Sequence, residues 1–140
     1  MEKFVKIDGG IGRVIAATGA VEQYAKESKE AINIVSSYPQ IFYGLEGINR
    51  VYNIGMPYLY EDYIAKGEFI EPEPYNHHKY YKDEKHLAEV FNYLLNNSDE
   101  LPEPKIILTQ NELDEAKAFI EDLKQKEKKK VLLVVKVMVV

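Results

Sequence analysis

The chain has 140 residues, of which 46% are hydrophobic and 29% are charged, and its formal net charge is −5. The length suits one folded domain with its own core, and the negative charge argues against a general nucleic-acid-binding protein. The sequence has no cysteine, which excludes disulfide bonds and thiolate metal sites. We expect no signal peptide, because the N-terminus has no long apolar region behind a basic start. We also expect no membrane span, because the longest apolar run, residues 131–140, is too short and contains Lys136. These features predict a cytoplasmic protein.

Strands and helices are expected to alternate over the first 55 residues or so. Short apolar runs predict three strands, over residues 4–7, 31–35 and 48–54. Helices are expected between them, over residues 13–26 and 40–45, the first with apolar side chains at helical spacing. This alternation is typical of an α/β fold, so we predict a Rossmann-like parallel sheet with flanking helices.

The middle of the chain, residues 58–81, is rich in tyrosine and also contains prolines and two adjacent histidines. A short helix over residues 61–66 and a short strand over residues 68–70 are predicted, and the rest is expected to be a long ordered loop. Such loops often carry functional residues. A helix with one apolar side is predicted to follow over residues 85–96.

A polar linker over residues 97–104 precedes the last predicted elements. Thr109 and Glu112 form a capping-box pattern at the start of a helix that is expected to run to about residue 128 and to bury its apolar side chains. Residues 131–140 predict a final strand without polar alternation. Such a strand must be central in a sheet or covered, and a partner strand is one possible cover.

The most informative stretch is the loop between the first strand and the first helix. Gly9, Gly10 and Gly12 allow a ligand to approach the backbone, and the following helix presents free N–H groups and partial positive charge. The alternative is that these glycines only permit a tight turn. A dinucleotide fingerprint fits poorly, because Ile15 stands where its third glycine is required, and no Gly-Lys-Ser/Thr follows for a P-loop. No cofactor is predicted.

A resemblance to a known family begins at this loop. The segment KIDGGIGRVIAATGAV, residues 6–21, resembles the opening of the ADP-heptose–lipopolysaccharide heptosyltransferases, and residues 39–51 and 108–116 look similar to two later segments of that family. These are glycosyltransferases of the GT-B fold, with two Rossmann-like domains and the donor bound mainly to the C-terminal one. The resemblance implies that residues 1–104 form a Rossmann-like acceptor-side domain, the N-terminal half of a GT-B fold. Residues 105–140 would then hold an interdomain helix and the first strand of a truncated second domain.

The resemblance also implies roles for the loop residues. In the family an acidic residue follows the loop glycine and acts as catalytic base or orients the acceptor; here Arg13 stands there, and Asp8 is the candidate base instead. Gly9, Gly10 and Gly12, together with Arg13, would hold the acceptor or the diphosphate. A complete enzyme would transfer a sugar from a nucleotide-sugar donor to a glycan-type acceptor, and we expect no transferase activity from this chain alone.

Three residues of the tyrosine-rich stretch are further candidates for acceptor or phosphate contacts. His77, His78 and Tyr81 offer flat faces and polar edges to a sugar, although Tyr81, like Tyr75 and Tyr80, could instead pack the loop onto the domain. Adjacent histidines point in different directions on an extended chain, so no metal site is predicted. Glu71 and Glu73 alternate with prolines and are expected either to be solvated or to line the edge of a cleft.

A second class of function fits the same residues. Arg13 in place of an acid, the lack of a donor-binding domain and the apolar residues 131–140 are also what a non-catalytic interaction or assembly protein with a Rossmann-like core would show. The sequence therefore leaves two hypotheses open: the acceptor-side domain of a glycosyltransferase, and an interaction protein.

Overall fold

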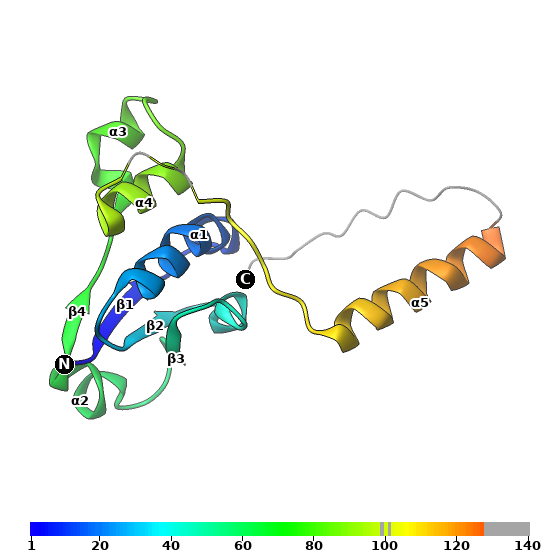
Figure 1. Cartoon of the computed structure of the whole chain (residues 1–140), viewed down its shortest axis with the longest axis horizontal. Coiled ribbons are helices and arrows are strands. Elements are labelled where there is room, and N and C mark those ends of the chain that lie inside the picture. Colours follow the sequence, from blue (N-terminus) through cyan, green and yellow to red (C-terminus); the bar gives the residue numbers. More distant parts are fainter. Residues whose placement is uncertain (99, 101, 128–140) are drawn as a thin grey trace. The chain divides into compact units, whose positions relative to one another are not determined.

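The computed structural model describes residues 1–98, 100 and 102–127 of the chain. Two compact units are present, the first being Met1–Ile107 and the second beginning at Leu108. Figure 1 shows the elements of each unit, coloured along the chain. The strand expected over residues 131–140 lies outside the described residues.

The described residues of the first unit contain a four-stranded parallel sheet. Its strands are β1 (Lys3–Ile7), β2 (Ile32–Ser36), β3 (Ile48–Asn53) and β4 (Glu68–Ile70), in the order β3-β2-β1-β4. The four strands predicted before residue 71 are each present within one residue of their expected bounds, and the predicted α/β class with a Rossmann-like parallel sheet is confirmed.

The strand order of the sheet changes direction at β1, which makes β1 the topological switch point. From β1 the chain adds β2 and then β3 on one side, and it returns to place β4 on the other side of β1. In open parallel sheets, ligands bind outside the carboxyl ends of the strands at such a switch point. Because β1 ends just before Asp8 and β4 ends just before Glu71, both carboxylates lie at this edge.

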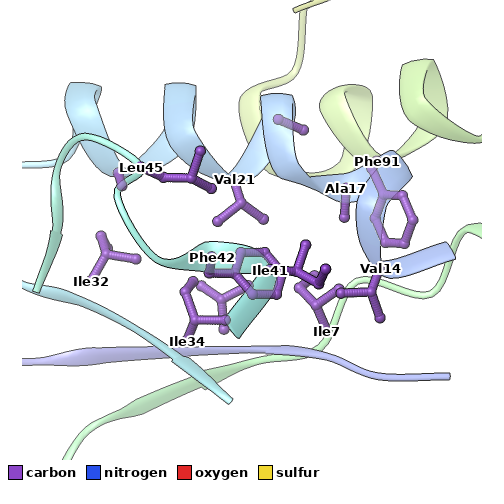
Figure 2. Close-up of a cluster of buried hydrophobic side chains, with 13 residues drawn as sticks. Ile7, Val14, Ala17, Val21, Ile32, Ile34, Ile41, Phe42, Leu45 and Phe91 are labelled. Atoms are coloured by element: carbon purple, nitrogen blue, oxygen red, sulfur yellow. The ribbon is translucent and has the colours of Figure 1, made fainter. Parts of the chain in front are cut away.

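One face of the sheet is covered by α1 (Ile11–Glu27) and α4 (Leu87–Asn96), which pack against each other. The short helix expected over residues 40–45 is a 3-10 helix, η1 (Pro39–Phe42), on the same face. Apolar side chains of these elements and of the sheet form the main core, shown in Figure 2. Its labelled members are Ile7, Val14, Ala17, Val21, Ile32, Ile34, Ile41, Phe42, Leu45 and Phe91.

The opposite face of the sheet has a smaller core, formed by Phe4, Val35, Leu59 and Ile64. Two short elements of the β3–β4 connection cover it, α2 (Leu59–Asp62) and η2 (Ile64–Lys66). They stand in place of the single helix expected over residues 61–66. The helix is interrupted because Tyr63 leaves the helical region, with φ −126° and ψ −60°.

A close backbone contact fixes residues 102–105 on α1. A Cβ on Gly19 would lie 2.7 Å from the carbonyl oxygen of Pro102 and 2.6 Å from that of Glu103. The Thr18 hydroxyl accepts a 2.8 Å hydrogen bond from the backbone N–H of Lys105, whose ammonium also pairs with Glu22. Burial acts to raise the pKa of Glu22, but the hydrogen bonds from Lys105 and from the backbone N–H of Glu46 outweigh it, so the pKa is lowered.

The stretch expected as a long loop contains two short helical elements, η3 (Pro74–Asn76) and α3 (His78–Tyr81). In the second unit, α5 (Gln110–Glu127) begins with the predicted capping box. The Thr109 hydroxyl accepts from the N–H of Glu112 at 3.2 Å, and the Glu112 carboxylate accepts from the N–H of Thr109 at 3.3 Å. Three apolar side chains expected to be buried are exposed: Leu113, Phe119 and Ile120.

Candidate functional site

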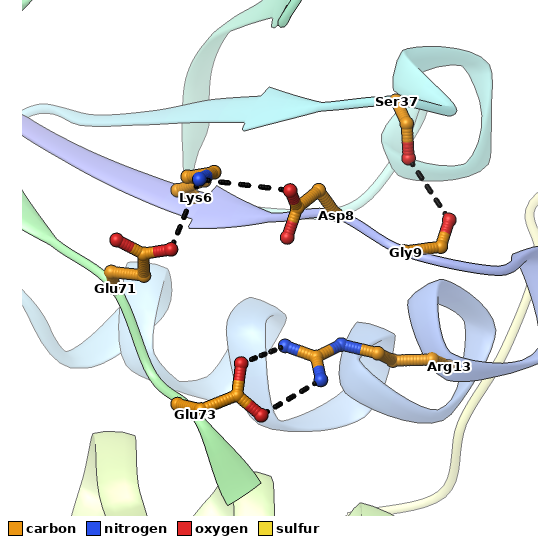
Figure 3. A network of polar contacts seen from close by, with 7 residues as sticks. All are labelled: Lys6, Asp8, Gly9, Arg13, Ser37, Glu71 and Glu73. Atoms are coloured by element: carbon orange, nitrogen blue, oxygen red, sulfur yellow. Dashed lines mark hydrogen bonds and ion pairs between the residues drawn. The ribbon is translucent and has the colours of Figure 1, made fainter. Parts of the chain in front are cut away.

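Two groups of polar side chains lie at the carboxyl edge of the sheet, on opposite sides of β1. Figure 3 shows the first group, which we call the carboxylate cluster, formed by Lys6, Asp8 and Glu71. The second group lies beside α1 and is centred on Arg13 and Glu73. The structure therefore places the two candidate catalytic residues, Asp8 and Arg13, in different surroundings.

In the carboxylate cluster, one ammonium bridges two carboxylates. Lys6 Nζ lies 3.0 Å from Oε1 of Glu71 and 3.6 Å from Oδ2 of Asp8. The hydrogen bond to Glu71 raises the pKa of Lys6, so the ammonium stays charged at neutral pH. The Asp8 side chain is 37% exposed. Asp8 thus offers solvent a carboxylate whose position is fixed by a neighbouring cation.

The carboxylate cluster can be assigned to one face of the sheet, because side chains along β1 alternate between the two faces. Val5 and Ile7 of β1 belong to the main core, whereas Phe4 belongs to the smaller core on the other face. Since side chains alternate along a strand, Lys6 lies on the same face as Phe4. The carboxylate cluster is therefore on the side of α2, away from α1 and α4.

A pocket of about 360 Å³ opens on this face and reaches Lys6. Three aromatic side chains in its lining are open to solvent: Tyr58 is 73% exposed, Tyr60 64% and Phe69 43%. Val35 of β2 also lines it, and so does Glu61 of α2. We call it the tyrosine pocket. The many tyrosines in the middle of the sequence indicate that an aromatic surface could form there. The sequence does not show which of these tyrosines lie together in the pocket.

The second group, which we call the arginine clamp, consists of Arg13, Glu73, Tyr75 and Phe91. Both terminal nitrogens of Arg13 donate to the two oxygens of Glu73, each at 2.9 Å. The guanidinium carbon lies 4.7 Å from the ring centre of Tyr75 and 5.6 Å from that of Phe91. The Arg13 side chain is only 10% exposed. Such a bidentate, stacked geometry is typical of a structural ion pair.

The arginine clamp bears on the role that the resemblance implies for Arg13. Because Glu73 takes both of its terminal nitrogens, Arg13 in this structure joins the segment after β4 to α1 instead of presenting a free guanidinium. The hydrogen bond from Arg13 lowers the pKa of Glu73. The Glu73 side chain is 39% exposed, but the ion pair with Arg13 fixes its position.

The three loop glycines differ in what they allow. Gly9 has φ +102°, in the region that favours glycine, and a Cβ there would lie 3.0 Å from Cδ of Arg13. The tight turn and the approach of Arg13 thus explain Gly9. At Gly10 and Gly12 a Cβ would meet nothing within 4 Å, and Gly10 caps α1 without a side-chain hydrogen bond. The start of α1 is open at these two positions.

The candidate residues of the tyrosine-rich stretch form a third group. The rings of His77 and His78 stack 4.5 Å apart, and His77 also lies 5.3 Å from the ring of Tyr93 in α4. The expectation that the two histidines point apart is wrong, because His77 caps α3, with Nδ1 accepting from the N–H of Lys79, and His78 is already the first residue of that helix. Tyr81 is exposed at the end of α3. The described contacts join these histidines to α4 and not to Asp8 or Arg13.

Comparisons with family models, curated proteins and solved structures found no match for this chain. Among the described residues, no group of three or more histidine, aspartate or glutamate side chains is arranged to hold a metal ion. None of the helices in that part of the chain has the length and apolar character needed to cross a membrane.

Replacing Glu73 with glutamine tests the arginine clamp. We expect the free energy of unfolding at pH 7 to fall by about 1–2 kcal/mol, because Arg13 loses a charged partner that is itself partly solvated. Since the folded-state pKa of Glu73 lies below its ordinary value of 4.5, the pair stabilises the fold above that pH and loses its effect as the pH falls through the folded-state value. Urea unfolding at pH 7, 5 and 3 should show a wild-type advantage that is smallest at pH 3.

The matched control for this prediction is Glu84→Gln, at an exposed position outside the arginine clamp. It should leave stability within about 0.5 kcal/mol of the wild type at every pH. An advantage of the wild type over the Glu73 variant that is equally large at pH 7 and pH 3 would show that the ion pair is not the cause.

Proposed function

We propose that the first unit binds a sugar acceptor at the carboxyl edge of its sheet and that Asp8 is the base of a glycosyltransferase. One observation carries the proposal: Asp8 is a partly exposed carboxylate at the switch point of the sheet, held by Lys6, which also lines the tyrosine pocket. The resemblance over residues 6–21 supports the same assignment, with this unit as the acceptor-side half.

The chemistry needs only one proton acceptor from this unit. The Asp8 carboxylate takes the proton of an acceptor hydroxyl while that oxygen attacks the anomeric carbon of a nucleotide-sugar donor. The bond from the anomeric carbon to the diphosphate breaks, and the diphosphate leaves with the electron pair. Lys6 holds the carboxylate in place for this step. Arg13 is assigned no part in it, because Glu73 occupies its terminal nitrogens.

The tyrosine pocket supports a sugar as the occupant. Aromatic rings such as Tyr58 and Tyr60 pair a flat apolar face with a polar hydroxyl, which suits a sugar ring with its C–H face and its outer hydroxyl groups. A volume of about 360 Å³ lies within the range of small-ligand pockets. The base and the aromatic surface meet at Lys6, so an acceptor in the pocket has its edge near Asp8.

The test is a titration of the ¹⁵N-labelled chain followed by NMR. We expect simple saccharides such as glucose and maltose to shift the amide signals of residues 6–9 and 58–61. We expect ADP and UDP at the same concentrations to leave the signals of the glycine loop unchanged, because the proposed unit is the acceptor side. Nucleotide binding at the glycine loop without saccharide binding would overturn the proposal.

A non-catalytic interaction protein remains the second candidate, and two observations favour it. Arg13 is used in a structural ion pair, and α5 exposes apolar side chains at Leu113, Phe119 and Ile120. The same titration separates the two functions, because an interaction protein has no reason to respond to saccharides at Asp8 and the tyrosine pocket.

A further inference from the structure

We infer that the tyrosine pocket selects an acceptor sugar that carries an amino group and disfavours an acidic or phosphorylated one. This inference rests on the proposed function, since it names the chemical class of the sugar bound at the same site. It follows from the charges that surround the pocket and from the way in which its one ammonium is already engaged.

The aromatic rings of the pocket can contact a sugar whether it is neutral or positively charged. Tyr58, Tyr60 and Phe69 place three exposed rings in one pocket. Each ring can lie against the C–H face of a sugar, and the face of an aromatic ring also attracts a cation. These side chains therefore accept a neutral or a positively charged sugar, and they offer nothing to an anion.

Among the described residues, three carboxylates and one ammonium belong to this site. Glu61 lines the pocket directly, while Asp8 and Glu71 hold Lys6 from the sheet edge. The local charge is thus net negative. An ammonium group on the ligand is attracted by this field, and a ligand carboxylate or phosphate is repelled by it.

The ion pairs of Lys6 with Asp8 and Glu71 strengthen the preference for an amino sugar over an acidic one. Its described contacts use one oxygen of Glu71 and one of Asp8. A sugar ammonium can approach the other oxygens without disturbing these pairs. An anionic sugar would have to draw Lys6 away from them and would leave two adjacent carboxylates without their cation. Arg13 offers no substitute, because it lies on the other side of β1 and is paired with Glu73.

The experiment compares three sugars that differ mainly in charge: glucosamine, glucose and glucuronate. They are titrated into the ¹⁵N-labelled full chain at about pH 6.5, where the amine is protonated. We expect glucosamine to bind about threefold more tightly than glucose, as suits a solvent-exposed ion pair, and glucuronate to bind more weakly than glucose.

Two pairs of variants separate charge from stacking. Glu61→Gln should weaken glucosamine more than it weakens glucose and so reduce the preference for glucosamine, whereas Glu84→Gln, outside the pocket, should leave the preference unchanged. Tyr60→Ala should weaken glucose and glucosamine alike, and Tyr43→Ala, at another exposed tyrosine outside the pocket lining, should weaken neither. Circular dichroism confirms that each variant is folded.

The outcomes bear on the two proposals separately. Equal affinity for the three sugars, or a preference for glucuronate, would overturn the charge selection while the binding of sugars at this site still stands. If no saccharide binds, the proposed function itself fails. A preference for glucosamine that is kept in Glu61→Gln but lost in Glu84→Gln would place the selecting charge elsewhere and would also overturn the inference.

Discussion

Replacing Phe91 with alanine is expected to lower the free energy of unfolding of the first unit by about 3–5 kcal/mol. The Phe91 ring is fully buried in the main core, in the same cluster as Val14 and Ala17 of α1 (Figure 2). Its removal leaves a cavity between α4 and α1. It also takes away one of the two rings beside the Arg13 guanidinium, so the segment after β4 should loosen with the core.

Tyrosine fluorescence measures this effect in one unit alone, because all eleven tyrosines lie between Tyr24 and Tyr93, within the first unit. Urea unfolding followed by this signal gives the free energy directly. The matched control is Phe69→Ala, which removes a partly exposed ring and should cost about 1 kcal/mol. Equal losses for the two variants would mean that Phe91 does not carry the packing of α4 on α1.

Replacing Gly19 with alanine is expected to destabilise the first unit by about 1–3 kcal/mol, although alanine is the better helix former. The new methyl group would stand 2.6–2.7 Å from two backbone carbonyl oxygens, those of Glu103 and Pro102. Backbone atoms cannot rotate out of the way as a side chain can. Residues 102–105 would have to move off α1, and the hydrogen bond from Lys105 to Thr18 would be lost.

The same helix supplies the control. A Cβ at Gly12 meets nothing within 4 Å, so Gly12→Ala should keep or raise stability by up to about 1 kcal/mol. Both variants are compared by urea unfolding, and hydrogen exchange of the Lys105 amide reports the lost contact. Two variants of equal stability, with the Lys105 amide equally protected, would show that the close approach at Gly19 is not tight in solution.

The elements of this fold could be predicted because their signals are local. A short apolar run bounded by Asp8 and glycines is sufficient to mark β1, and helical spacing of small and apolar side chains marks α1. Even the three-residue strand β4 could be predicted. The capping box at Thr109 is equally local, since both partners lie within four residues.

The site depends on pairings that no local pattern contains. Glu71 reaches Lys6 only because β4 pairs with β1, and these two residues are 65 positions apart in the chain. The ion pair of Arg13 with Glu73 arises in the same way, so the charges of both residues were visible in the sequence but their partners were not. The stacked histidines had a local cause, the cap that His77 provides for α3, but that helix was not predicted.

The position of β1 between β2 and β4 has a consequence for the order in which the chain folds during synthesis. Of these four strands, the central strand β1 is made before the others, and its neighbour β4 follows about sixty residues later. The βαβ unit formed by β1, α1 and β2 can close early, because its contacts are comparatively near in sequence. One edge of β1 then stays unpaired until residue 70 has been made. During that interval Phe4 lacks the partner strand that carries Phe69, and the nascent chain exposes the edge to which other strands can add.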